Sequence, residues 1–354
     1  MQLSPGVLRT KIKMAPKKQK NSYLKALLWR DVALLAFAIF YIATFVKLFG
    51  DVNSSVAVSS FCMLLGIRFV NYGYQLSDSI FALGGVLLIM LLGSMFFQYL
   101  PLPWFFIAHS LSLLFILMTT TAQPTFGNGG LYTFSYIFIT GNPVSASQFS
   151  NRLVAMALVW FLLAVVLWRN HHQQPLKRRL HHVLTNFSWH SDTSHWQLRL
   201  ALGVSTALTV AQLLQLHRAV WLGFACMSIL LPQNPHYAKR VGARLTGVII
   251  GSSLFIISLA LVPDAWAFIL APLAGFGLGL TDNYFYHSVL NCFGALSIAT
   301  SLFGTVPAGE LRIFNNFLGI LVAVIFIIGF KLLNHYFLTT NHFTAQNNNS
   351  SLPD

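Results

Sequence analysis

The stretch Ala219–Gly251, AVWLGFACMSILLPQNPHYAKRVGARLTGVIIG, decides which fold the chain is expected to adopt. Its first apolar run ends at Leu231, directly before Pro232, and Pro235 follows three residues later. Proline lacks an amide hydrogen and disfavours helical backbone in the residue before it, so a helix stops here. The runs before and after the prolines are therefore predicted to be two separate helices.

The segment between the two runs is basic, and glycines are spaced along the second run. Three cations follow the prolines: Lys239, Arg240 and Arg244. Basic residues in short loops favour the cytoplasmic face of a membrane. Gly247 and Gly251 give the second helix a small face on which another helix can pack closely. The stretch predicts two membrane crossings joined by a short cytoplasmic loop.

The composition extends this interpretation to all 354 residues. Hydrophobic residues make up 56% of the sequence and charged residues only 8%, whereas soluble domains carry about 25% charged residues. The mean hydropathy is +0.66. At roughly 20 apolar residues per crossing, about twelve helices fit. We predict an all-α polytopic protein, multi-pass in the cell (cytoplasmic) membrane, with both termini in the cytoplasm.

The apolar segments fall into two similar groups. They occupy residues 32–49, 53–67, 79–98, 104–121, 128–140 and 152–168, and then 198–216, 219–231, 241–262, 265–280, 285–304 and 312–337. Cys62 and Cys226 each precede a methionine in the second segment of their group, and Arg152 and Arg312 open the sixth. Because each half has an even number of crossings, the halves are predicted to be parallel repeats of six helices.

These segments divide the chain into five parts. They are a basic cytoplasmic arm (1–29), a first six-helix membrane unit (30–169), a cytoplasmic linker (170–197), a second six-helix membrane unit (198–338) and a disordered tail (339–354). The arm has no acidic residue, which fits a determinant of topology, with contact to anionic lipid as the alternative. The tail is rich in Asn and Ser, a composition typical of disorder.

The net charge of +14 follows from this topology and does not indicate nucleic acid binding. Most of the 22 basic residues fall on the predicted cytoplasmic side, as the positive-inside rule requires. Four fall on the outer side: Lys47, Arg152, Arg218 and Arg312.

Arginines near the ends of the predicted helices are the candidate substrate-binding groups. Arg30 and Arg199 open equivalent helices of the two halves, and Arg240 and Arg244 lie at a cytoplasmic helix end. A guanidinium can hold a carboxylate through two parallel hydrogen bonds. The alternative is an anchor whose charge reaches the lipid headgroups. Three aromatic side chains are candidates for contact with a substrate: Trp221, Tyr284 and Tyr286.

Three ionisable residues near the membrane are candidates for proton coupling: Asp31, Asp282 and His287. A medium of low dielectric raises the pKa of a carboxyl group, which lets it take up a proton near neutral pH. Asp282 and His287 enclose the densest group of polar and aromatic residues near a span, DNYFYH. The alternative interpretation is an interfacial belt of tyrosines beside a loop aspartate.

Signatures of enzymes and of metal sites are missing from the sequence. It contains no GxxxxGK[ST], GxSxG, HExxH or CxxC motif. The cysteines Cys62, Cys226 and Cys292 lie in apolar segments, where they act as small hydrophobic residues. His109, within a span, is expected to hydrogen bond between helices. We expect no enzymatic activity, no cofactor, no metal and no disulfide.

The order of residues in the second half resembles the fusaric-acid-resistance-like family of integral membrane transporters. Arg199 opens a helix, Trp221 enters the next apolar run, and that run ends near proline. The segment RVGARLTGVIIG from Arg240 to Gly251 is similar to the family pattern R-x-x-G/A-R-x-x-G-x-x-x-G. This family includes bacterial aromatic acid exporters and is distantly similar to plant malate channels.

The resemblance implies a transporter that exports small organic anions of the aromatic carboxylate type by proton-coupled antiport. Two alternatives stay open: a passive organic-anion channel, and a non-transporting membrane scaffold for envelope assembly. The expected partners are the anion and the lipid bilayer. The oligomeric state, a homo-oligomer included, and the identity of the substrate are left open by the sequence.

Overall fold

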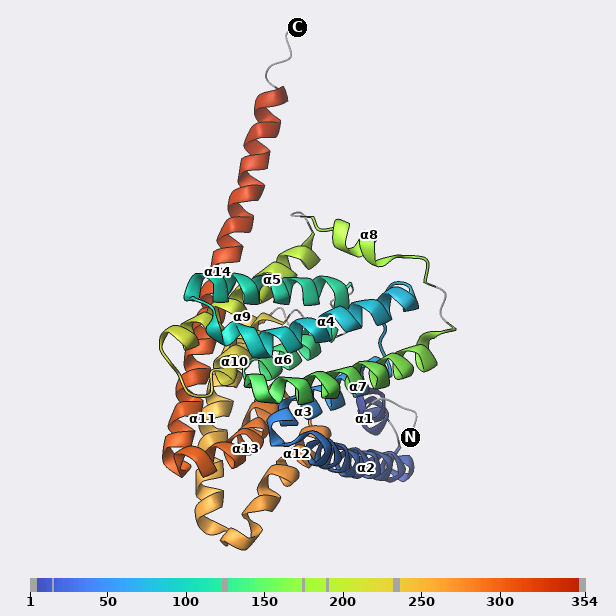
Figure 1. Ribbon diagram of the computed structural model, residues 1–354, viewed down its shortest axis with the longest axis vertical. Coiled ribbons are helices and arrows are strands. Elements are labelled where there is room, and N and C mark those ends of the chain that lie inside the picture. Colours follow the sequence, from blue (N-terminus) through green and yellow to red (C-terminus); the bar gives the residue numbers. More distant parts are fainter. Residues whose placement is uncertain are drawn as a thin grey trace.

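The computed structural model describes residues 5–14, 16–122, 127–173, 176–188, 191–231 and 236–349, and all regular structure in these ranges is helical. The first part of the chain forms α1 (Pro5–Met14), α2 (Lys17–Phe49), α3 (Ser54–Ile67), α4 (Leu76–Phe96), α5 (Leu102–Thr120), α6 (Asn128–Thr140), α7 (Ala146–His171) and α8 (Leu180–Thr185). The second part forms α9 (Asp192–Leu213), α10 (Val220–Leu230), α11 (Tyr237–Leu261), α12 (Leu270–Leu280), α13 (Tyr284–Phe303) and α14 (Thr305–Asn349) (Figure 1). The prediction of an all-α fold is confirmed.

Each of the twelve predicted apolar segments overlaps one of these helices. Six described helices are long and apolar enough to cross a membrane: Gln19–Phe49, Leu76–Tyr99, Leu102–Thr120, Ala146–His171, Tyr237–Leu261 and Thr305–Leu333. The helices α3, α6, α10 and α12 have only 14, 13, 11 and 11 residues, whereas a crossing needs about 20. The long helices make this a multi-pass membrane protein. Twelve crossings in two parallel repeats remain a prediction.

The short helix α10 lies at the centre of the second half. Every residue of α10 except Phe224 is buried, and the helix packs against α6, α9 and α14. Gly319 of α14 lies so close to the Leu222 carbonyl that no side chain fits between them. Such close contact supplies the van der Waals attraction that holds helices together where there is no water to expel. The first apolar run of the deciding stretch is therefore the core of this half.

The end of α10 follows from the sequence after it. The helix ends at Leu230, and Leu231 has extended backbone with ψ of 142°. Extended backbone is what a following proline imposes. The two prolines themselves, Pro232 and Pro235, lie outside the described residues.

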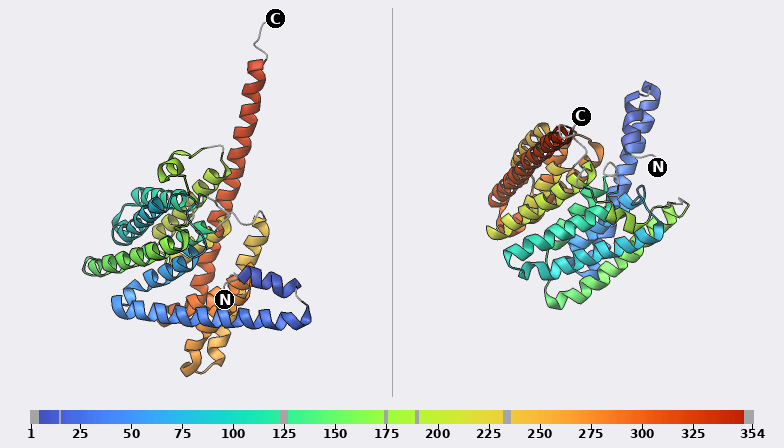
Figure 2. Two further views of the ribbon diagram at one scale, coloured as in Figure 1. Left: turned by 90° about the vertical axis from the view of Figure 1, so that its right-hand side faces the viewer. Right: turned by 90° about the horizontal axis from the view of Figure 1, so that it is seen from above.

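Each half places one of its helices against the other half. Helix α9 packs against α5 of the first half, and α2 packs against α12 of the second. In Figure 1, α4, α5 and α7 run across the view while α11 and α14 run along its vertical axis. Figure 2 (left) shows α2, in blue, at a steep angle to α14, in red. The long helices of the two halves therefore cross instead of forming one parallel bundle.

Both ends of the chain are more helical than the sequence led us to expect. Part of the basic arm forms α1, which folds back on α2, and α2 begins at Lys17 instead of near residue 30. The tail expected to be disordered from residue 339 continues α14 to Asn349. No glycine or proline occurs between Lys331 and Asn349, so nothing in the sequence breaks this helix.

Candidate functional site

Two arginines are buried together between α10, α11 and α14. Arg244 of α11 is 6% exposed, and its Nε donates a hydrogen bond of 3.1 Å to Oδ1 of Asn316 on α14. The Nδ2 atom of Asn316 donates to the backbone oxygen of Arg312 at 2.8 Å. The Arg312 guanidinium, on a side chain 4% exposed, lies 4.8 Å from the centroid of the buried Trp221 ring. We call Arg244, Arg312, Asn316 and Trp221 the arginine cluster.

The arginine cluster lies deep between the ends of its helices. Arg244 is the eighth residue of α11, about 10 Å along that helix, and Asn316 is the twelfth residue of α14, about 17 Å along it. The two helices run in opposite directions (Figure 1). Both residues therefore lie about two helical turns or more inside helices that are long enough to span a membrane.

The charges of the arginine cluster are not balanced by protein. Arg244 is close enough to Arg312 for the two positive charges to repel each other. Among the described residues no carboxylate forms an ion pair with either guanidinium, and Nε of Arg312 is buried without a hydrogen-bond partner. Stacking on a buried tryptophan contributes about 2 kcal/mol, whereas burial costs several kcal/mol for each ion. An anion would remove this imbalance.

Arg240 and Tyr284 fasten the end of α10 to the starts of α11 and α13. The Arg240 guanidinium lies 4.2 Å from the centroid of the Tyr284 ring, and its Nε donates to the Ser228 backbone oxygen at 2.6 Å. The Tyr284 hydroxyl donates to Oγ of Ser228 at 2.7 Å. Arg199 of α9 makes a similar link to α11, donating from Nη2 to the Tyr237 hydroxyl at 2.9 Å. These two arginines are engaged with protein groups.

The two glycines predicted to mediate packing lie directly against α13. A Cβ atom at Gly247 would be 2.7 Å from Cβ of Ser288, and one at Gly251 would be 2.5 Å from the Val289 backbone oxygen. Real Cβ atoms do not approach other atoms this closely, so only glycine fits at these positions. The close approach of α13 also brings Cys292 near the Arg312 side chain.

Three other predicted site residues lie away from the cluster. Asp31 of α2 is 5% exposed, and its carboxyl group rests against Gly279 of α12. Arg30, the residue before it, is half-buried, and its Nη1 has no hydrogen-bond partner. Tyr286 is 55% exposed and contacts the ring of its neighbour Phe285.

The remaining two proton-coupling candidates lie where α12 ends and α13 begins. Asp282 is exposed, whereas His287 is half-buried. The Nε2 atom of His287 lies 2.9 Å from the Thr281 backbone oxygen, so the imidazole closes the turn before α13. Asp31 is the only one of the three candidates that is buried.

Sequence reasoning did not select Arg312, Asn316 or Cys292 as site residues. Arg312 was visible as a charge opening the last apolar segment, and charges inside spans are default candidates for function. Its assignment to the outer side, by counting positive charges, hid this signal. Asn316 carries no charge, and nothing in the sequence shows that it faces Arg244.

Two buried polar residues of the first half, Arg152 and His109, have hydrogen-bond partners on other segments. Arg152 is 0% exposed, and it donates to Oδ1 of Asn53 at 3.1 Å and to the backbone oxygens of Asn142 and Val52 at 2.8 and 2.6 Å. His109, as expected, bonds between helices, its Nδ1 lying 2.7 Å from the Tyr136 hydroxyl. Arg152 thus differs from Arg312, whose Nε is buried without a hydrogen-bond partner.

The end of α5 is bordered by another buried polar group. Tyr74, in the loop before α4, donates from its hydroxyl to the Thr119 backbone oxygen at 2.8 Å. Burial raises the pKa of the Tyr74 hydroxyl, so this group stays neutral at physiological pH and adds no charge there.

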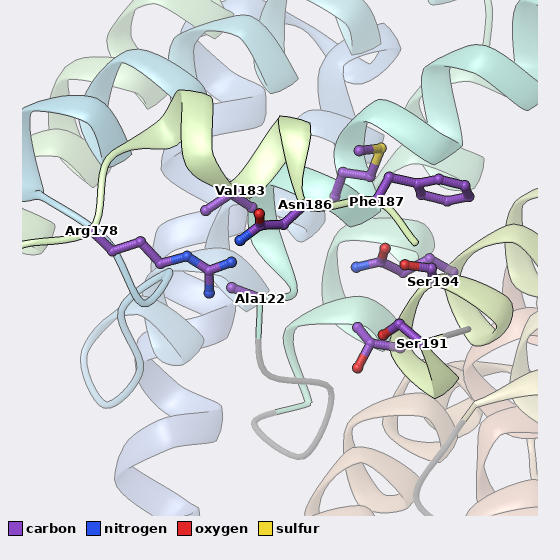
Figure 3. A pocket seen from close by; sticks show the side chains of 10 residues that line it. Ala122, Arg178, Val183, Asn186, Phe187, Ser191 and Ser194 are labelled. Atoms are coloured by element: carbon purple, nitrogen blue, oxygen red, sulfur yellow. The ribbon is translucent and has the colours of Figure 1, made fainter. Parts of the chain in front are cut away.

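A separate cavity of about 150 Å³ lies at the linker (Figure 3). It is lined by Met118, Ala122, Arg178, Val183, Asn186, Phe187, Ser191, Thr193, Ser194 and Gln197. None of the substrate-binding or proton-coupling candidates lines it. None of the four residues of the arginine cluster lines this cavity. The described residues contain no group of three or more His, Cys, Asp or Glu side chains that could hold a metal ion.

Comparison with known proteins places the arginine cluster inside a family match. Residues 206–326 match the model of a family described as fusaric acid resistance protein-like. The match runs from α9 to α14 and contains Trp221, Arg240, Arg244 and Arg312, and it confirms the resemblance predicted from the sequence. No curated protein and no solved structure matches the chain. The family points to a membrane protein related to transport.

Proposed function

We propose that this protein exports small organic anions across the cell membrane by exchange with protons. The family match supports transport. The aromatic carboxylate class is what the resemblance to a family that includes aromatic acid exporters implies. Trp221 supplies an aromatic face beside the guanidiniums, which suits an aromatic acid. The absence of a phosphate-binding motif for ATP in the sequence favours an ion gradient as the source of energy, and we propose no catalytic activity.

One observation carries this proposal: Arg244 and Arg312 are buried side by side without an acidic partner. A structural role would require hydrogen-bond acceptors or a carboxylate for each charge, as Arg152 has. A carboxylate substrate would satisfy both guanidiniums when bound and leave them mutually repelling when released. Binding at this position is therefore favourable for an anion and reversible.

For the coupling proton, Asp31 is the candidate that its surroundings favour most. A buried carboxyl group is costly to ionise, so it can exchange a proton as access to water changes. Asp31 lies where α2 of the first half meets α12 of the second, so its environment depends on how the halves are placed. Asp282 and His287 are retained as secondary candidates because they are more accessible.

We further propose that the chain crosses the membrane twelve times, as two six-helix units related by a parallel repeat, with both termini in the cytoplasm. In this repeat α2 corresponds to α9, and α5 corresponds to α12. The contacts of α9 with α5 and of α2 with α12 are therefore the reciprocal pair that a pseudo-twofold relation produces. The pairs α4–α7 and α11–α14, which occupy corresponding places in the two units, are also both in contact.

The proposal is tested with purified protein in liposomes loaded with benzoate as the probe. An acidic exterior should accelerate benzoate efflux above that from protein-free liposomes loaded with the same benzoate. Arg244→Ala and Arg312→Ala should each lower this efflux about tenfold or more, because each removes a charged hydrogen-bond donor to the anion. Arg68→Ala is the matched control, since Arg68 is exposed and loses the same charge.

The same experiment separates the alternatives. Efflux that ignores the proton gradient at fixed membrane potential would indicate a passive channel, and Asp31→Asn should then have no effect. Absence of protein-dependent flux for benzoate and for a panel of related weak acids would favour a non-transporting scaffold. Efflux that persists unchanged in both Arg244→Ala and Arg312→Ala would remove the arginine cluster from the mechanism.

A further inference from the structure

We propose that the cavity between the linker, α5 and α9 binds a small phosphate-type anion, and that the bound anion joins the two halves of the protein. The cavity volume of about 150 Å³ suits an ion of a few heavy atoms, since pockets for larger organic ligands have about 300 Å³ or more. This proposal is independent of the substrate that the arginine cluster takes.

Three kinds of hydrogen-bond donor converge on the cavity. Figure 3 shows the Arg178 side chain extending toward Ala122 and Asn186, with Ser191 and Ser194 across the space. Arg178 supplies a permanent positive charge, and the Asn186 amide supplies a neutral donor. The start of α9, a helix of 22 residues, supplies backbone amides that have no partner within the helix.

The first turn of α9 is left open for such a ligand. Ser191 occupies the N-cap position, but its side chain makes no capping hydrogen bond. The Ser194 hydroxyl accepts from the Ser188 amide at 3.3 Å and so does not cap the helix either. The first intrahelical bond runs from the His195 amide to the Ser191 oxygen, which leaves the preceding amides available.

A second observation, independent of the helix end, also indicates a ligand. Gln197 lines the cavity, is 5% exposed, and donates from Nε2 to the Leu117 oxygen and to the oxygen and Oγ1 of Thr121 at 3.0 to 3.3 Å. These three bonds fix the amide, and its carbonyl oxygen accepts no hydrogen bond from the described residues. Hydrogen phosphate matches the site because it has an O–H for this acceptor as well as oxygens for the donors.

The net charge around the cavity is positive, which favours an anion. Lys177, Arg178 and Arg179 follow one another at this edge of the linker. Two carboxylates lie near this region: Asp78, whose Oδ2 accepts from the Leu180 amide at 2.9 Å, and Asp192, which is exposed in the first turn of α9. Neither lines the cavity. The local balance remains positive.

The position of the cavity gives the bound anion a structural consequence. Met118 and Ala122 belong to the end of α5 in the first half, whereas Thr193 and Ser194 begin the second half. Arg178 is held near α4 because its backbone oxygen accepts from the Gln75 amide at 2.8 Å. An anion that bonds to Arg178 and to the start of α9 therefore ties the halves together and should stabilise the folded protein.

The test measures thermal unfolding of the full-length protein in detergent as inorganic phosphate replaces chloride at constant ionic strength. A ligand that binds only the folded state raises the unfolding temperature in proportion to its occupancy. Arg178→Ala should weaken the apparent phosphate affinity about tenfold or more, because a charged hydrogen bond is lost. Asn186→Asp, at an exposed position, should weaken it as well by placing a negative charge in the wall.

Lys177→Ala is the matched control, because Lys177 loses the same charge but does not line the cavity, and its phosphate response should equal that of the unaltered protein. No phosphate-specific stabilisation of the unaltered protein would overturn the proposal, as would equal responses in Arg178→Ala and Lys177→Ala. Nanodiscs of phosphatidylcholine with and without phosphatidic acid identify the source. Stabilisation by phosphatidic acid that depends on Arg178 assigns a lipid headgroup, whereas an unchanged phosphate response in both discs assigns the free ion.

Discussion

Two buried arginines, Arg152 and Arg312, lie near the start of the last long helix of their halves and yet have different surroundings. Arg152 has a hydrogen-bond acceptor for Nε and for both terminal nitrogens of its guanidinium. Arg312 has an unpartnered Nε and repulsion from Arg244. The first arrangement stabilises a fold and the second destabilises it. An uncompensated charge inside a membrane span is a default candidate for function.

Because of this difference, substitution by methionine should have opposite effects on stability at the two arginines. Arg152→Met should lower the free energy of unfolding by about 3 kcal/mol or more, because it leaves buried acceptors unpaired. Arg312→Met should leave the unfolding temperature unchanged or raise it, because it removes an uncompensated buried charge. Thermal unfolding in detergent measures both. If Arg312→Met lowered the unfolding temperature as much as Arg152→Met, Arg312 would have a structural role, and the proposed anion site would be contradicted.

At the scale of elements, the contact between α11 and α13 sets the position of the arginine cluster. Val289 and Ser288 of α13 press on Gly251 and Gly247 of α11, and this approach brings Cys292 to Arg312. The glycines are required by the lack of space for a Cβ atom. The sequence pattern marked the correct positions, but it did not identify the helix that packs on them.

Gly251→Ala should therefore destabilise the protein by about 1–3 kcal/mol, the usual cost of overpacking. Gly242→Ala lies on the same helix with nothing within 4 Å of its added Cβ, and it should be neutral or stabilising by up to about 1 kcal/mol. The unfolding temperatures of the two variants measure this difference. Equal unfolding temperatures for the two variants would show that α13 does not pack on α11 as described.

At the scale of the whole molecule, the number of crossings is open to a direct test. If only the six long helices cross, the loop after α3 lies outside and the loop after α9 lies inside; twelve crossings reverse both positions. Arg68 and Leu214 are exposed residues in these two loops. The long helices of the two halves cross in space, so the fold alone does not give the answer (Figure 1).

We expect Arg68→Cys to be protected from a membrane-impermeant maleimide in intact cells, and Leu214→Cys to react, in a background where the three native cysteines are replaced. Permeabilised cells should label both positions, which controls for accessibility. Labelling of Arg68→Cys but not of Leu214→Cys in intact cells would support six crossings and exclude the twelve-crossing topology.

Sequence patterns were enough to predict the all-α class, the membrane location, the position of each apolar helix and the family resemblance of the second half. These are local properties, because hydropathy, proline breaks and a short motif act within a few residues of chain. Arg244 and Trp221 were selected for the same reason. Helical α1 and the continuation of α14 were not foreseen, because an Asn-rich or basic composition does not by itself prevent a helix that no proline interrupts.

Only the tertiary structure brought Arg312 and Asn316 to Arg244. These residues approach from opposite ends of two antiparallel helices, and no periodicity in the sequence records which faces of the helices meet. The same holds for the linker cavity, whose walls come from α5, the linker and α9. Whether a charge inside a span is satisfied depends on packing between distant segments. That packing distinguishes Arg152, whose guanidinium has three hydrogen-bond acceptors, from Arg312, whose Nε has no partner.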